Sequence, residues 1–276
     1  MNISNNLFSL ENKNILITGS AGLLGKMHAE AIMAFGGNVI LTDIDIEKVK
    51  NLSHDLNQKY VNQSIYYQMD ITSEQSVLNV FNELKEKGIF VDTLINNAAC
   101  NPAVGAVGMK ANNRLENLDF DLWSKDLDVS LKGSVICSKI FGTEMSKRNF
   151  GNIINISSDL GIIAPDQRLY YKEGLPDDQQ DVKPVSYSIT KHGIIGLTKY
   201  LATYWADKGV RSNSISPGGV FNNQNTLFLS NVAKKIPLGR MANANEYQGA
   251  IIFLCSDASS YMNGANLVID GGRSIW

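Results

Sequence analysis

The sequence is poor in several features that mark particular classes of protein. Its 276 residues include only three cysteines and three histidines, and no two cysteines form a Cys-x-x-Cys pair. Widely spaced cysteines predict buried thiols in a reducing compartment, and the scarcity of clustered ligand residues predicts no metal site. The net charge is −2, without a basic stripe. We therefore expect no nucleic-acid partner.

Long apolar runs and export signals are also missing. No apolar run approaches the roughly 20 residues that a membrane-spanning helix requires. The first residues, MNISNNLFSLENK, lack the charged-then-apolar pattern of a signal peptide. These features predict a cytoplasmic protein with no membrane partner. Hydrophobic residues make up 44% and charged residues 19% of the chain, which is typical of a globular protein.

The most informative segment is NILITGSAGLLG, residues 14–25. Its apolar start predicts a buried strand, and a glycine-rich turn then leads into an amphipathic segment. Strand, glycine turn and helix in this order form the opening of a dinucleotide-binding βαβ unit, whereas three glycines alone also occur in plain turns. Gly19 permits the tight turn, Gly22 lets backbone approach a pyrophosphate, and Gly25 lets the helix pack closely. The helix N-terminus would face the phosphates.

Strand-like and helical segments alternate along the rest of the chain. The expected strands after the first are residues 38–42, 64–69, 92–96, 151–156, 210–215 and 266–269. The expected helices are residues 22–35, 45–59, 73–87, 120–147, 187–207 and 244–256. This alternation predicts an α/β fold: a Rossmann-type doubly wound parallel sheet of about seven strands with helices on both faces. No linker divides the chain, so we expect a single domain over residues 1–276.

Two segments, residues 100–117 and 164–184, interrupt the alternation. The first is rich in glycine and asparagine, and the second, APDQRLYYKEGLPDDQQDVKP, is polar and bounded by prolines. Both follow strand ends at the edge where parallel sheets bind ligands. Long loops in compact domains are either functional or decorative, and this position favours substrate-site loops.

Asp43, at the end of the second expected strand, bears on the choice of dinucleotide. An acid there accepts hydrogen bonds from the ribose hydroxyls and repels a 2′-phosphate. No arginine stands nearby, and Asp45 and Glu47 add negative charge. The alternative is that Asp43 or Asp45 caps the following helix. The acid favours NAD over NADP.

Tyr187 and Lys191 stand four residues apart and would share one face of a helix. A tyrosine, with a reference pKa of about 10, is a poor base at neutral pH, but a neighbouring ammonium lowers that pKa. The spacing also occurs by chance in many helices. Here Ser157 and Ser158 end the fifth expected strand and would bring a hydroxyl to the same place, which favours general acid/base chemistry.

Together these motifs resemble those of the short-chain dehydrogenase/reductase superfamily over nearly the whole chain. The matching motifs are TGSAGLLG (18–25), DI (70–71), NNAA (96–99), NISSDLG (155–161), YSITK (187–191), SPGG (216–219) and NLVIDGG (266–272). The order of these motifs and their spacing around the sheet also match the family, apart from one insertion.

The resemblance implies specific roles. Tyr187 would be the catalytic acid/base, Ser158 would hold the substrate oxygen, and Lys191 would bind the nicotinamide ribose and lower the pKa of Tyr187. Ser158 fits better than Ser157 because it begins the Ser-x-x-Gly spacing of the family. The other residues expected at the cofactor, from the glycine motif and the resemblance together, are Gly19, Ser20, Gly22, Leu23, Leu24, Gly25, Asp43, Asp70, Ile71, Asn97, Ala98, Pro217, Gly218 and Val220.

The chain departs from the family pattern at two single positions. Small members usually have glycine at the position of Leu23 rather than Gly22. The spacing found here is more typical of a larger branch with an added substrate domain, but the chain length favours the small branch. Ser130 stands where the family has an asparagine that bends a helix and holds a water for proton relay. A serine can bond its i−4 carbonyl and bend a helix, so Ser130 is a candidate for that relay.

A third departure is the insert 164–184, which lengthens the segment between Ser158 and Tyr187. A similar insert occurs in family members associated with carbohydrate and surface-glycan metabolism. Arg168 could bind a carboxylate or phosphate, and the adjacent tyrosines could stack on a sugar. The alternative is a solvated flap or a subunit contact.

We therefore expect an NAD-dependent oxidoreductase that transfers a hydride between nicotinamide and a secondary alcohol or ketone of a sugar, polyol or sugar derivative. The alternatives are a reductase of simple ketones or acyl groups, and a non-catalytic NAD-binding sensor or scaffold. The resemblance also implies a homotetramer or homodimer. Leu227, Phe228 and Trp276 are candidate contact residues.

Overall fold

The computed structural model describes residues 7–100 and 114–276. Most of the loop expected over residues 100–117 therefore lies outside the described residues. In the described part, seven parallel strands form one sheet in the order β3-β2-β1-β4-β5-β6-β7. The strands are β1 (Asn14–Thr18), β2 (Asn38–Asp43), β3 (Ser64–Gln68), β4 (Thr93–Asn96), β5 (Gly151–Ile156), β6 (Val210–Pro217) and β7 (Asn266–Ile269).

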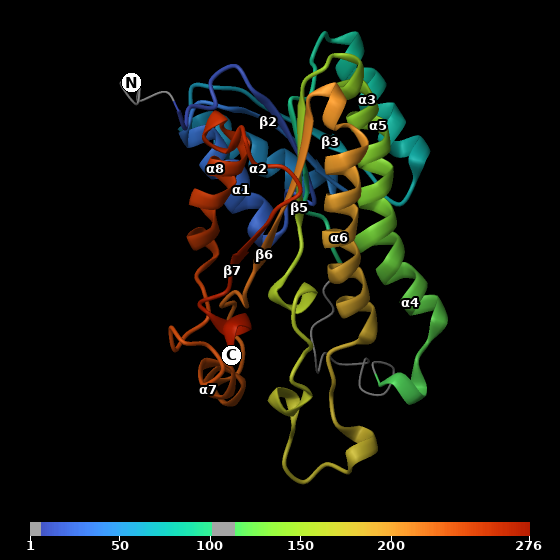
Figure 1. The fold of residues 1–276 in the computed structure, drawn as a ribbon, viewed down its shortest axis with the longest axis vertical. Coiled ribbons are helices and arrows are strands. Elements are labelled where there is room, and N and C mark those ends of the chain that lie inside the picture. Colours follow the sequence, from blue (N-terminus) through green and yellow to red (C-terminus); the bar gives the residue numbers. More distant parts are fainter. Residues whose placement is uncertain (1–6, 101–113) are drawn as a thin grey trace.

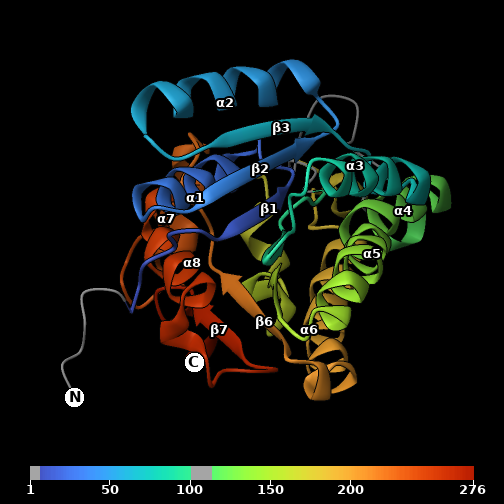
Figure 2. The same cartoon turned by 90° about the horizontal axis from the view of Figure 1, so that it is seen from above.

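Helices cover both faces of this sheet, so the expected doubly wound α/β fold is confirmed (Figures 1 and 2). The helices are α1 (Leu23–Ala34), α2 (Ile46–Lys59), α3 (Glu74–Glu86), α4 (Phe120–Leu127), α5 (Gly133–Lys147), α6 (Val185–Tyr204), α7 (Thr226–Ala233) and α8 (Gln248–Cys255). Side chains of α1, α2 and α8 share one core cluster, and those of α3, α5 and α6 share the other. None of the described helices is both long and apolar enough to cross a membrane.

The central strands form where the sequence is continuously apolar. Ile15 and Ile17 of β1 pack into the cluster on one face, while Leu16 between them packs into the cluster on the other. All three are fully buried, as expected of a parallel strand covered on both sides. Each such side chain contributes about 1.5–3 kcal/mol of burial free energy, which fixes the strand in place.

The expected helix over residues 120–147 is interrupted. A π-helical turn, Asp128–Lys132, separates α4 from α5, and Ser130 lies at its centre. Such turns widen a helix by one residue and occur often beside functional sites. Another difference is the two-turn helix α7, which lies outside the helices expected from the sequence.

The elements that shape the candidate site lie beyond the carboxyl ends of the strands. The insert 164–184 extends from that edge, beside α7 and the C-terminus (Figure 1). It contains two short 3₁₀ turns, Gln167–Tyr170 and Asp177–Gln179. A further 3₁₀ turn, Asp159–Gly161, follows β5, and the chain ends with another, Arg273–Ile275.

Candidate active site

A cavity of about 960 Å³ opens at the carboxyl ends of the strands. It extends from the glycine turn after β1, past the start of α6, to the insert. Fifteen of the expected site residues line it: Gly19, Gly22, Leu23, Leu24, Asp43, Asp70, Ile71, Asn97, Ala98, Ser158, Tyr187, Lys191, Pro217, Gly218 and Val220.

Ser20 and Gly25, although expected at the cofactor, lie behind the cavity wall. Ser20 is fully buried, and its hydroxyl donates to the Thr42 carbonyl at 3.2 Å. Gly25 is needed for packing, because a Cβ there would lie 2.5 Å from the carbonyl oxygen of Gly19. Their place in the motif predicted proximity to the cofactor but not the direction of each residue.

Ser130 also lies away from the cavity, so the expected relay has no support in the described contacts. Its side chain is buried in the π-helical turn, and its Oγ accepts a hydrogen bond from the backbone N–H of Cys100 at 2.9 Å. The expectation of a distorted helix at Ser130 is met, but the contact found for its hydroxyl is structural. Ser130 ties the chain after β4 to the helix.

The glycine turn forms a narrow backbone cradle. Gly19 has φ +61°, and a Cβ there would lie 2.7 Å from the Cα of Ala98. The side-chain amide of Asn97 donates to the carbonyls of Thr18 and Gly19, each at 2.9 Å. Helix α1 begins after Gly22 with no acidic residue in its first turn. The open N–H groups and close backbone approach fit a pyrophosphate.

Asp43 and Asp45 have separate roles. Asp45 caps α2, since its side chain accepts a hydrogen bond from the Lys48 N–H at 3.2 Å. Asp43 lines the cavity, and its carboxylate accepts the backbone N–H groups of Ala21 and Asp45, each at 3.2 Å. The capping alternative therefore belongs to Asp45, and Asp43 is held at the cavity by the turn that follows β1.

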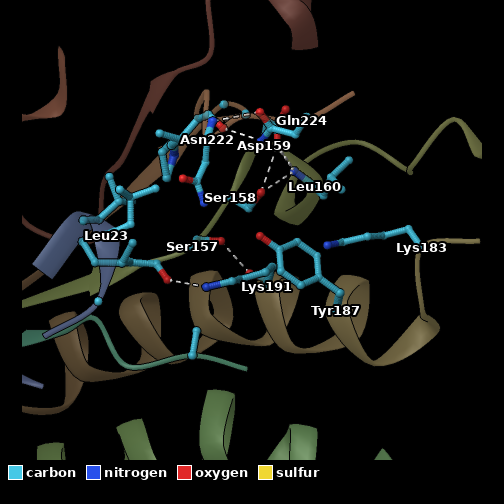
Figure 3. A pocket seen from close by; sticks show the side chains of 18 of the residues that line it. Leu23, Ser157, Ser158, Asp159, Leu160, Lys183, Tyr187, Lys191, Asn222 and Gln224 are labelled. Carbon is cyan, nitrogen blue, oxygen red and sulfur yellow. Dashed lines mark hydrogen bonds between the residues drawn. The ribbon is translucent and has the colours of Figure 1, made fainter. Parts of the chain in front are cut away.

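Tyr187 and Lys191 lie one turn apart near the start of α6, and both reach the cavity (Figure 3). The Nζ of Lys191 donates to the Ile156 carbonyl at 2.9 Å and lies 5.8 Å from the centroid of the Tyr187 ring. Burial and, to a lesser extent, the positive charge of Lys183 together lower the pKa of Lys191 to about 8. Lys191 is thus a buried, oriented cation.

The resemblance implied that Lys191 lowers the pKa of Tyr187, but in this structure the pKa of Tyr187 lies above its usual value. Burial raises the pKa of Tyr187, the hydrogen bond with Ser158 lowers it, and the charge of Asp159 raises it again. Loss of hydration penalises the phenolate strongly, while the Lys191 ammonium is directed at a backbone carbonyl.

Ser158 belongs to a chain of polar contacts that the sequence did not reveal. Its Oγ donates to Asp159 at 2.8 Å, and the other carboxylate oxygen of Asp159 accepts from Arg273 at 2.8 Å. Asp159 and Arg273 are both almost fully buried. Ser157, by contrast, donates to the backbone carbonyl of Lys191 at 2.7 Å, so its hydroxyl links the end of β5 to α6. An acid directly after Ser158 was the one signal available.

Lys183 is a second residue that sequence reasoning missed. It ends the insert just before α6, and its Nζ lies 3.8 Å from the centroid of the Tyr187 ring (Figure 3). Burial lowers the pKa of Lys183 to about 8. A lysine in a polar loop usually reads as a solvated charge, so only the folded insert reveals its place.

The insert forms part of the cavity wall, but Arg168 does not. Tyr170, Tyr171 and Lys172 line the cavity, and the Tyr170 ring stacks on Phe228 of α7 with centroids 5.6 Å apart. The guanidinium of Arg168 instead makes two hydrogen bonds of 2.8 Å to the carboxylate of Asp166, and its side chain is 82% exposed. The expected anion site at Arg168 is therefore not supported.

Known families match almost the whole chain. The family model for short chain dehydrogenase matches residues 13–172, and that for Enoyl-(Acyl carrier protein) reductase matches residues 179–274. The chain belongs to the short-chain dehydrogenase family. This short-chain dehydrogenase is 31% identical to the NAD-dependent glycerol dehydrogenase of Listeria innocua serovar 6a, over 97% of this chain and 96% of that relative.

Solved structures agree with this assignment. A gluconate 5-dehydrogenase from Burkholderia cenocepacia, in complex with NADP and tartrate, has a TM-score of 0.85 and 25% identity, covering 98% of both chains. A short chain dehydrogenase from Leptospira borgpetersenii with bound NAD⁺ has a TM-score of 0.82 and 31% identity, covering 99% of this chain and 97% of that one. The short-chain dehydrogenase described here is an oxidoreductase that acts on alcohol groups with a nicotinamide cofactor.

Proposed function

We propose that this short-chain dehydrogenase uses NAD to interconvert a secondary alcohol and a ketone in a sugar, polyol or sugar derivative. The main support is one arrangement: Ser158, Tyr187 and Lys191 line a single cavity whose two ends differ. One end is the glycine turn, which suits a dinucleotide. The other is the polar insert, which suits a hydroxyl-rich substrate.

The proposed cofactor contacts follow from the cradle. The turn at Gly19 and the N-terminus of α1 would hold the phosphates, Asp43 the adenosine ribose, and Lys191 the nicotinamide ribose. Bound NAD supplies the carbon that accepts or returns the hydride. Because the solved relatives include both NAD and NADP complexes, the choice of NAD rests on the negative charge of Asp43.

The proposed roles of the side chains follow from proton transfer. During oxidation, the phenolate of Tyr187 would accept the proton of the substrate hydroxyl as the hydride leaves the same carbon. Ser158 would hydrogen-bond the substrate oxygen and orient it toward Tyr187. Positioned groups of this kind contribute about 10²–10⁴-fold for proton transfer, with a further gain from orientation.

The proposed substrate class follows from the far end of the cavity. Tyr171, Asp181, Asn222 and Gln224 line it, and they offer both donors and acceptors to several hydroxyl groups. Two relatives are named for polyhydroxylated substrates, glycerol and gluconate. Both observations favour a sugar or polyol over a simple ketone.

The proposed function is tested with the purified protein and NAD⁺ against polyols, sugars, sugar acids, sugar phosphates and simple alcohols. NADH absorbance reports turnover. Saturable turnover with one carbohydrate is the expected result. Turnover with simple alcohols alone would favour the generic reductase, and NADH binding without any turnover would favour a sensor. Either outcome would overturn the proposal.

We also propose a homodimer or homotetramer. Val135 of α5 and Ile189, Tyr200 and Tyr204 of α6 expose apolar surface on the same side of the sheet, each with 44–59% of its area accessible. Burying such a face between two copies would remove it from water. Sedimentation of the purified chain measures the assembly, and a monomer at micromolar concentration would contradict it.

A further inference from the structure

Two lysines reach the ring of Tyr187. The Nζ of Lys183 lies 3.8 Å from the ring centroid, and that of Lys191 lies 5.8 Å away. Figure 3 shows them approaching the ring from opposite sides. A cation within about 6 Å of an aromatic face is attracted by the electrons of the ring. This attraction becomes stronger when the phenol loses its proton, because the ring then bears a full negative charge.

The insert holds Lys183 in this position through its backbone. The Lys183 N–H donates to the side-chain oxygen of Gln167 at 2.8 Å, and the Gln167 amide nitrogen donates to the Lys183 carbonyl at 3.1 Å. The next residue, Pro184, is the N-cap of α6. Gln180 binds both backbone groups of Lys172 in the same way, at 2.8 and 2.9 Å. The insert is therefore internally bonded, and it joins rigidly to the helix of Tyr187.

The titratable and charged groups around Tyr187 come from several elements. They are Lys191 on α6, Lys183 before it, Asp159 after β5, Tyr170 in the insert, Arg273 near the C-terminus and, facing Lys183, Asp126 on α4. Arg273 pairs with Asp159 and offsets much of its negative charge. The two lysines are the cations that would act most directly on a phenolate at Tyr187.

We propose that Lys183 acts through Tyr187, as a second cation that stabilises its phenolate form alongside Lys191. The proposal rests on the proposed function, since it matters for catalysis only if Tyr187 is the acid/base. A positive charge within about 4–6 Å favours the charged form of an acid. When the phenolate takes the substrate proton, both ammonium groups lose this stabilisation, and they regain it when Tyr187 releases that proton.

Burial lowers the pKa of Lys183 to about 8, while the negative charges of Asp159 and Asp126 favour its ammonium form. With its Nζ 3.8 Å from the ring centroid, this ammonium is attracted more strongly once Tyr187 carries a negative charge. Loss of one proton from the pair gives either a neutral lysine beside a phenol or an ammonium beside a phenolate. That ionisation belongs to the pair rather than to one residue.

Two variants separate charge from shape. Lys183→Gln removes the cation, and Lys183→Arg keeps it. The measurement is the pH dependence of kcat/KM for alcohol oxidation. For Lys183→Gln the acid limb should move up by about one pH unit, which means about a tenfold loss at neutral pH that is recovered at high pH. Lys183→Arg should keep the wild-type profile. An unchanged profile with a raised KM for anionic substrates would contradict the proposal and assign Lys183 to substrate binding.

A second measurement needs no substrate. Tyrosinate absorbance is titrated for the protein and for Tyr187→Phe, with Lys183 intact and with Lys183→Gln, and the differences isolate Tyr187. Its ionisation should occur at higher pH once the lysine is replaced. Equal titrations would overturn the proposal. If Tyr187→Phe kept full turnover, the proposed function would fail instead, while this titration would still decide the influence of Lys183.

Discussion

The hydroxyl of Ser158 has one proton, and it donates that proton to Asp159 at 2.8 Å. Arg273 holds Asp159 from the other side, at 2.8 Å. A residue near the C-terminus therefore fixes the orientation of the candidate substrate-binding hydroxyl. To donate to a substrate oxygen, Ser158 must turn its proton away from Asp159. The buried ion pair between Asp159 and Arg273 thus influences how readily Ser158 can donate its proton to the substrate oxygen.

Cofactor choice is a prediction for a single residue. Asp43 should accept the ribose hydroxyls of NADH and repel the 2′-phosphate of NADPH. Fluorescence titration of wild type should therefore give a dissociation constant at least about tenfold lower for NADH, since one such repulsion is worth about 1.4 kcal/mol or more. Asp43→Asn should narrow the gap by weakening NADH binding and improving NADPH binding. Equal constants in wild type would contradict the assignment.

Among the helices and strands, the helical segment between β4 and β5 shows which features could be predicted from the sequence and which could not. Its start at Phe120 and its end at Lys147 agree with the range expected from the sequence. The π-helical turn at Asp128–Lys132 was expected only as a bend. The direction of the Ser130 side chain could not be predicted, because it depends on a hydrogen bond with the backbone N–H of Cys100, which is distant in sequence.

Among the other elements, some positions could likewise be predicted from the sequence and others could not. The central strands were predictable because parallel strands buried on both faces read as apolar runs, as Ile15 to Ile17 do. Motif spacing also predicted that Tyr187 and Ser158 lie close together, and both line one cavity. The position of Lys183 was not predictable, because it depends on the hydrogen bonds between Gln167 and the end of the insert. Arg168, expected as a candidate anion-binding residue, instead pairs with Asp166, two residues away in the sequence.

The contact of Ser130 leads to a prediction for this element. Ser130→Ala removes the acceptor of the Cys100 N–H, which should cost about 1–3 kcal/mol of stability. Turnover should stay within a few-fold of wild type, because the hydroxyl does not line the cavity. Chemical denaturation and kcat, measured together, check both parts. A loss of turnover as large as that of Tyr187→Phe, with stability unchanged, would contradict this prediction and support a proton relay through Ser130.

For the whole molecule, the cavity is bounded by segments far apart in sequence. Asp166 of the insert pairs with Lys235 after α7 at 3.1 Å, and Trp276 donates to the Lys235 carbonyl at 3.1 Å. A small apolar cluster, centred on Leu169 and Val232, lies between the insert and α7. The insert, α7 and the C-terminal turn therefore form one wall opposite the nucleotide half of the sheet.

Global stability should depend on pH through His28. This side chain is buried on α1, and burial lowers its pKa from 6.5 to about 3. The unfolded chain takes up a proton below pH 6.5 that the folded chain does not, so stability falls as pH decreases from about 6.5 toward 3. The cost by pH 5 should be about 2 kcal/mol.

Denaturant unfolding of wild type and His28→Leu at pH 7 and pH 5 measures this effect. The variant should lose the His28 part of the pH dependence, whatever its stability at pH 7. His54→Leu, which replaces an exposed histidine on α2, serves as the matched control and should keep the wild-type slope. A slope that is the same in all three proteins would contradict the assignment.

In the proposed function, Tyr187 transfers the substrate proton in an NAD-dependent oxidation. The most direct test compares wild type with Tyr187→Phe, using the best substrate found and measuring both kcat/KM and the dissociation constant of NADH. We predict a loss of at least about 100-fold in kcat/KM, because the phenyl ring cannot accept the proton, with little change in NADH binding. A variant that keeps kcat/KM within a few-fold of wild type would contradict the proposed proton transfer by Tyr187.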